Sequence, residues 1–227
     1  MNLKLFLLSF LIPFFVLSQS KKEDANSIVK EVSKQYNATK NYSYTMSYNF
    51  FESYTSNKVF ESFNGLLIKN DKTIYFKLKD TEFLTFEDVS IKINNDEKAL
   101  LMGKNIKSDS PLNLDDYLKV FNSKIVKSDA SSWTIELLTK MTSQIMFNKI
   151  VFVVSKKNYV ITKQILYFLN PSDEDKMSKP RLEIVFNPIK RDVRKEEALL
   201  SKSSYFISRD KDIKLAKKYN DYKIYNE

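Results

Sequence analysis

Hydrophobic and polar residues alternate along most of this chain, which is the pattern of β-strands. The clearest case is Asn41 to Tyr54, where large apolar side chains at even positions from Tyr42 to Phe50 are separated by serine, threonine and asparagine. Because successive strand residues point to opposite sides of a sheet, a period of two gives a strand one apolar face. This segment therefore predicts a long strand with a strongly aromatic face.

Further strand-like segments follow at short intervals. They are 58–69, 73–79, 82–87, 89–94, 98–102, 123–127, 133–139, 145–155, 159–169, 181–187, 205–207 and 222–225. The turns between them are short and polar, such as Asn70-Asp71-Lys72, which favours tight hairpins. Connections of this length leave no room for crossover helices, so we predict an antiparallel meander and not a parallel sheet.

Two segments have helical spacing instead. The first begins near Asp24 and places Ala25, Ile28, Val29, Val32 and Tyr36 on one side. The second follows Ser110-Pro111, with Asn113 as the expected N-cap, Asp115 and Asp116 in the first turn, and an apolar stripe of Leu114, Tyr117, Leu118 and Phe121. Residues 193–203 fit either a helix or a lid loop.

Together these elements predict a mainly β protein with a few helices. A sheet of about ten or eleven antiparallel strands usually curls, and helices often cover its concave face. We therefore expect an incomplete, strongly curved antiparallel β-barrel with helices across its concave face, formed by a single domain over residues 21–227.

The first twenty residues have the features of a secretory signal peptide. Lys4 precedes an apolar run from Leu5 to Leu17, and small residues follow at Ser18 and Ser20. The run is shorter than the roughly 20 residues that span a bilayer. We predict cleavage near Ser18 or Ser20 and, in a double-membrane bacterium, a periplasmic protein.

The composition excludes several kinds of chemistry. The chain has no histidine and no cysteine, so it lacks the residues of a Ser-His-Asp relay, an ordinary zinc site or a disulfide. Its two glycines are too few for a phosphate-binding loop. A glycosidase would need only paired carboxylates, but Asp115-Asp116, Glu87-Asp88 and Asp173 to Asp175 each fit a helix start, a turn or a loop. We predict no catalytic residues, no metal and no cofactor.

The formal net charge is +9. Most lysines are interspersed with aspartate and glutamate, so a solvated basic surface explains the charge, and attraction to anionic lipid headgroups remains an alternative. Export argues against a nucleic-acid partner.

The order of elements resembles the periplasmic lipoprotein-carrier family, which is LolA-like. The segments that correspond are 25–36, 42–50, Gly65-Leu66-Leu67-Ile68, Ile74-Tyr75-Phe76, 82–102 and Ser110-Pro111-Leu112. The chain departs from the family in having no arginine in its first half and in a C-terminal extension from about residue 208. The resemblance implies a half-barrel that carries lipidated proteins, handed over between inner- and outer-membrane partners.

We therefore expect a monomeric, non-enzymatic carrier or binder that holds acyl chains of lipoproteins or phospholipids in an apolar cavity, in the manner of a transport chaperone. The expected lining residues are Tyr44, Met46, Tyr48, Phe50, Phe76, Phe86, Trp133, Ile135, Phe152 and Ile161. The same side chains would equally form a packed core under the helices. The alternative functions are a cell-envelope interaction or sensor module on the same fold, and an unrecognised esterase or glycosidase.

Overall fold

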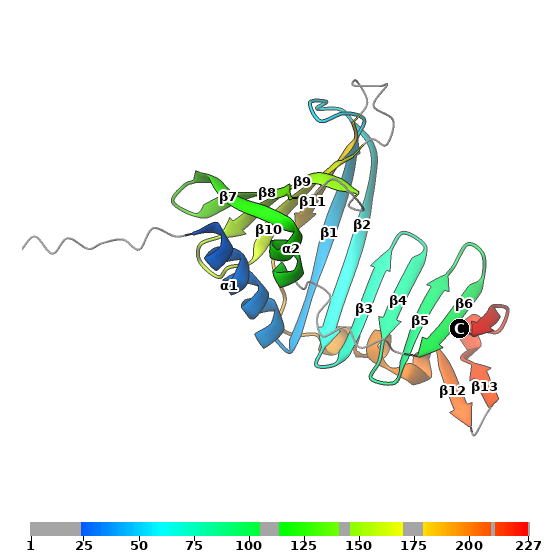
Figure 1. Cartoon of the computed structure of the whole chain (residues 1–227). Coiled ribbons are helices and arrows are strands. Elements are labelled where there is room, and N and C mark those ends of the chain that lie inside the picture. Colours follow the sequence, from blue (N-terminus) through cyan, green and yellow to red (C-terminus); the bar gives the residue numbers. More distant parts are fainter. Residues whose placement is uncertain (1–23, 105–113, 141–145, 170–178, 210–211, 227) are drawn as a thin grey trace, which may run out of the picture.

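The computed structural model describes residues 24–104, 114–140, 146–169, 179–209 and 212–226. The predicted signal peptide and the expected N-cap Asn113 lie outside these residues. Twelve strands form one curved sheet in the order β14-β6-β5-β4-β3-β2-β1-β11-β10-β9-β8-β7. The sheet stays open, and two helices lie against one part of it (Figure 1). The predicted open half-barrel is confirmed.

The strands of this sheet occur close to where the alternation predicts them. They are β1 Asn41–Phe51, β2 Val59–Asn70, β3 Thr73–Leu78, β4 Thr81–Thr85, β5 Val89–Asn94, β6 Ala99–Lys104, β7 Phe121–Ser128, β8 Ser132–Thr139, β9 Phe147–Ser155, β10 Ile161–Phe168, β11 Arg181–Phe186 and β14 Lys223–Asn226. Consecutive strands from β1 to β6 and from β7 to β11 pair antiparallel, and β1 pairs with β11 to join these two meanders. The sheet is antiparallel as predicted except at one edge, where β14 runs parallel to β6. The long segment between β11 and β14 supplies the crossover that a parallel pair requires.

Both described helices were predicted. Helix α1 spans Ala25–Ala38, which confirms the predicted start near Asp24, and the Asp24 carboxylate caps the helix by accepting a hydrogen bond from the Ser27 backbone N–H at 3.2 Å. Helix α2 spans Leu114–Val120 and carries Asp115 and Asp116 in its first turn. The carboxylates there complement the positive end of the helix dipole.

The two faces of the sheet have separate hydrophobic cores. We call the side to which β1 directs Tyr42, Tyr44 and Met46 the helix face, because these residues share a core with α1 and α2. The opposite side, the tail face, has its core over β2 to β6, where Ile68, Leu84 and Leu100 are buried. One half of the sheet is therefore covered on its helix face and the other half on its tail face.

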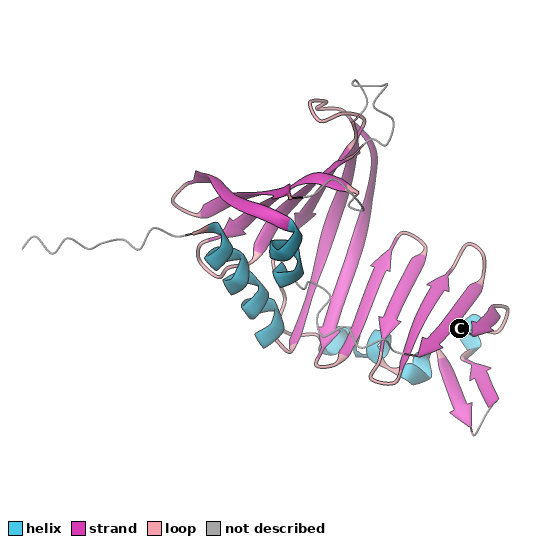
Figure 2. Cartoon of the chain, viewed as in Figure 1, coloured by secondary structure: helices cyan, strands magenta, loops and turns pink. Residues whose placement is uncertain are grey.

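The C-terminal segment covers the tail face. It contains the 3₁₀ helices η1 Arg194–Leu200, η2 Lys202–Ser204 and η3 Lys217–Tyr219 and the hairpin of β12 Phe206–Arg209 and β13 Asp212–Leu215. The ambiguous segment 193–203 thus forms mainly 3₁₀ turns (Figure 2). Tyr205 and Tyr219 are fully buried in the tail-face core. The predicted extension is an integral layer of the fold.

Hydrogen bonds also hold the C-terminal segment on the tail face. Glu82 is buried on the tail face, and its carboxylate accepts hydrogen bonds from the Tyr75 hydroxyl and the Asn95 amide, each at 3.1 Å. The Tyr222 hydroxyl in turn donates to the Asn95 side-chain oxygen at 2.9 Å. A buried carboxylate needs such partners to be tolerated, so these contacts fix the position of the tail on the sheet.

Candidate functional site

The helix face under α1 and α2 is closely packed. Six of the predicted lining residues are nearly inaccessible to solvent there: Tyr44, Met46, Trp133, Ile135, Phe152 and Ile161. They share one core with Ile28, Val29 and Val32 of α1. For these six side chains the structure shows the packed arrangement that was the alternative to an open cavity.

The predicted residues farther along β1 are in a different environment. Tyr48 and Phe50 are half-buried and belong to a group of aromatic rings at one end of the sheet. This ring cluster consists of Tyr48, Phe50, Phe60, Phe63, Phe147 and Phe168. The Tyr48 and Phe63 ring centroids are 5.0 Å apart, and those of Phe147 and Phe168 are also 5.0 Å apart. The cluster packs on the helix-face core and extends it toward solvent.

Local backbone geometry assembles the ring cluster. The pairing of β1 with β2 shifts register between Phe50 and Phe51, because Phe50 faces Glu61 and Phe51 faces Val59. Phe60 is the extra residue of this bulge, and its ring centroid lies 5.9 Å from that of Phe50. A bulge redirects side chains in this way, and Phe60 remains 51% exposed.

Gly65 lets two side chains of β1 lie across β2. A Cβ atom at Gly65 would lie 2.9 Å from Tyr48 Cε2 and 3.1 Å from Met46 Cγ. Real Cβ atoms essentially never show a contact as short as 2.9 Å, so any larger residue would displace the Tyr48 ring. Glycine at this position therefore sets how closely the cluster packs on the sheet.

Arg181 holds the β1–β2 connection beside the ring cluster. Its Nη1 donates hydrogen bonds to the carbonyls of Ser53, Tyr54 and Ser56 at 2.7 to 2.9 Å, and its Nε donates to Glu183 at 3.1 Å. The guanidinium also lies 3.9 Å from the centroid of the Phe51 ring. The sequence offered no signal for this role, since the carbonyls are more than a hundred residues away in the chain.

The remaining two predicted residues lie on opposite faces. Phe76 is on the helix face, where it packs against the core beside Leu67. Phe86 is buried in the tail-face core, so the prediction that it faces the same cavity as Phe76 is wrong. The reason is that β4 ends at Thr85, and Phe86 packs under the C-terminal segment that covers this side.

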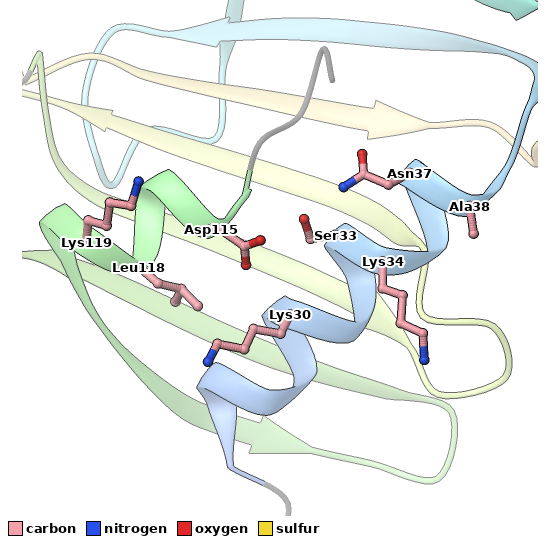
Figure 3. Close-up of a pocket in the computed structure, with 8 residues that line it drawn as sticks. All are labelled: Lys30, Ser33, Lys34, Asn37, Ala38, Asp115, Leu118 and Lys119. Atoms are coloured by element: carbon pink, nitrogen blue, oxygen red, sulfur yellow. The ribbon is translucent and has the colours of Figure 1, made fainter. Parts of the chain in front are cut away.

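A groove of about 730 Å³ separates α1 from α2 (Figure 3). Its lining residues are Lys30, Ser33, Lys34, Asn37, Ala38, Asp115, Leu118 and Lys119. The Ser33 hydroxyl is buried and has no hydrogen-bond partner in the part of the chain that is described. The Lys34 and Lys119 ammonium groups point away from each other in Figure 3, and Lys119 pairs with Asp116 at 2.6 Å. The groove therefore lacks a convergent set of charges.

The electrostatics of the helix face favour neutral groups. Burial raises the pKa of Tyr36 and of Tyr48 to about 12 each, and it raises the pKa of Tyr42 and Tyr44 as well. These phenols stay protonated at physiological pH, and the Tyr48 hydroxyl contacts the Met46 sulfur at 3.1 Å. None of these four tyrosines is ionised at physiological pH, so the surface that they form is suited to hold apolar groups.

The carboxylate pairs have structural partners. Glu87 contacts Lys72 at 2.6 Å, and Asp88 pairs with Lys202 of the C-terminal segment. Asp173 to Asp175 lie outside the described residues. Within the described ranges no cluster of acidic side chains has the arrangement of a metal site, and no helix is long and apolar enough to cross a membrane.

Comparison with known proteins gives similarity of fold at low sequence identity. No family model matches the chain, and no curated protein matches its sequence. An uncharacterised conserved protein from Thermus thermophilus superimposes with a TM-score of 0.53 at 10% identity, over 90% of this chain and 100% of that one. This similarity spans nearly the whole chain and shows that the fold occurs in a solved structure.

A LolA superfamily protein from Nitrosomonas europaea is also similar, with a TM-score of 0.35 at 8% identity over 80% of this chain and 99% of that one. A MucA/MucB complex structure from Pseudomonas aeruginosa gives a TM-score of 0.44 at 8% identity, over 74% of this chain and 57% of that chain. A LolA superfamily protein is thus among the solved structures to which this chain is similar, in agreement with the resemblance predicted from the order of elements.

Proposed function

We propose that this protein is an exported, non-enzymatic carrier or binder of acyl chains, acting in the periplasm. The observation that carries the proposal is the ring cluster, where half-exposed aromatic side chains continue the closed core of the helix face into solvent. The resemblance to the LolA-like family supports the same function, because it implies a half-barrel that carries lipidated proteins.

The chemistry of the ring cluster fits an acyl chain. Covering each methylene with apolar surface stabilises it by about 0.8 kcal/mol relative to water. Transfer of a chain between two such surfaces needs no cofactor and no covalent step. Aromatic side chains supply large contact areas with few rotatable bonds, and Arg181 keeps the nearby β1–β2 connection in place.

A fluorescent fatty acid tests this proposal. We expect the mature protein to bind it, and we expect Phe60→Glu and Phe63→Glu to weaken the affinity at least about ten-fold, since each places a charge among the rings. Val185→Glu is the matched control, because Val185 is 41% exposed on β11 but points to the opposite face. Circular dichroism confirms that each variant is folded.

Equal affinity of all three variants would remove the basis of the proposal. Native mass spectrometry of protein isolated from its own cells provides the second measurement. Co-purified phospholipid or acylated peptide supports a carrier, whereas protein that is always free of lipid favours the alternative, an interaction or sensor module of the cell envelope.

A further inference from the structure

A row of mostly apolar side chains crosses the half of the helix face that α1 and α2 leave uncovered. Neighbouring strands pair these residues one by one: Leu67, Phe76, Phe83, Lys92, Leu101 and Tyr225. We call this set the open row. It runs from β2 to β14, across the half of the sheet that lies away from α1 and α2 (Figure 1). Of the residues in β3 to β6, only Phe76 packs against the helix-face core.

Leu67, at the β2 end of the open row, is buried in the helix-face core, and the other members of the row are exposed or half-buried. Phe83 is 39% exposed and Tyr225 is 51% exposed, while Phe76 and Leu101 are half-buried. Single exposed apolar residues are ordinary, but a contiguous row across several strands indicates a surface that meets another apolar medium. The described residues of the C-terminal segment before β14 pack on the opposite face, so they do not shield this row.

The charge around the open row is positive. Every second residue of β3 to β6 and β14 lies on the same face as the open row. These residues are apolar, small polar or basic, and none of them is aspartate or glutamate. Lys92 and Lys223 are exposed on this face, and the Lys92 ammonium lies 5.7 Å from the Phe83 ring centroid. At the β2 end of the face, the Glu61 carboxylate is paired with Lys79.

We propose that the open row docks the protein on the surface of an anionic lipid bilayer. Aromatic rings enter the boundary between headgroups and acyl chains, and lysines beside them extend to the phosphates. A protein partner fits less well, since Lys92 stands in the middle of the row and the cores of protein interfaces are depleted of lysine. Docking is independent of the acyl-chain site, because it uses different side chains.

Co-sedimentation with lipid vesicles tests the docking. We expect the mature protein to sediment with vesicles of phosphatidylcholine and phosphatidylglycerol, to remain in solution with phosphatidylcholine alone, and to dissociate from the anionic vesicles in high salt. Each basic side chain near an anionic surface contributes about five-fold to partitioning, so the pair Lys92→Gln and Lys223→Gln should reduce it roughly twenty-five-fold. Phe83→Ser should reduce it as well.

Matched variants on the other side of the molecule provide the controls. Lys77→Gln with Lys214→Gln removes the same charge from exposed lysines outside the open row, and Val185→Ser removes an exposed apolar residue from the opposite face. These controls should sediment like the natural sequence. Equal loss in the control pair, or no sedimentation with anionic vesicles, would overturn the proposal.

Two other outcomes are distinguishable. A dimer in solution that dissociates when Phe83 becomes serine would show that a second copy covers the row, which contradicts membrane docking. Fatty-acid binding that survives Phe83→Ser while sedimentation is lost supports both proposals, and fatty-acid binding without any sedimentation leaves only the acyl-chain site.

Discussion

At the scale of single residues, the Arg181 side chain joins β11 to the β1–β2 connection. Its side chain is 9% exposed and satisfies three carbonyls of the β1–β2 connection. We expect Arg181→Met to lower the free energy of unfolding by about 3 kcal/mol or more, because it leaves the Glu183 carboxylate and three carbonyls without this donor. Urea denaturation measures the change, and limited proteolysis of residues 52–58 reports loosening of the connection.

Arg194 provides the control for that experiment. It forms an ion pair with Asp192 at 2.6 Å, but its side chain is 86% exposed. Exposed ion pairs contribute little, so Arg194→Met should change stability by less than about 1 kcal/mol. Arg181→Lys should restore only part of the loss, since an ammonium lacks the planar arrangement of donors. Similar losses for both methionine variants would contradict the role assigned to Arg181.

At the scale of secondary-structure elements, the C-terminal segment acts as the second layer for β3 to β6. Tyr219 of η3 is 1% exposed and stacks on Tyr205 with ring centroids 5.8 Å apart. We expect Tyr219→Ala to cost about 3 to 5 kcal/mol of stability because it leaves a cavity in the tail-face core. Tyr225→Ala, in β14 of the same segment, should cost less than about 0.5 kcal/mol. Thermal and urea unfolding of the two variants tests the contrast.

At the scale of the whole molecule, buried tyrosines connect stability to alkaline pH. The pKa of Tyr36 and of Tyr48 is raised from 10.0 to about 12 by burial, and burial also raises that of Tyr75, Tyr205 and Tyr219. Below pH 10 the phenols are protonated in both the folded and the unfolded state. Above it the unfolded chain releases protons that the folded chain retains, so the free energy of unfolding falls as pH rises from about 10 to about 12.

The measurement is urea denaturation across this range, together with tyrosinate absorbance. We expect absorbance to rise cooperatively with unfolding, because the buried phenols ionise only when the cores open. A gradual rise in absorbance with unchanged circular dichroism would show that these tyrosines are accessible in the folded state.

The alternation of apolar and polar residues determined much of the fold. It located nearly all strands within a few residues and both described helices, because side-chain period and capping are local properties of the chain. The aromatic face of Asn41–Phe51 and the start of the first helix near Asp24 were predicted for this reason. The exclusion of histidine- and cysteine-based chemistry also follows from composition alone.

Only the tertiary structure decided which apolar residues are packed and which are exposed. Trp133 and Phe60 are both aromatic strand residues, but the helices bury the first and a bulge exposes the second. Phe86 was assigned to the wrong face because the sequence does not show that the C-terminal segment returns to cover it. Faces, bulges and parallel edges depend on contacts between distant segments, and those contacts arise from packing of the whole sheet instead of from local pattern.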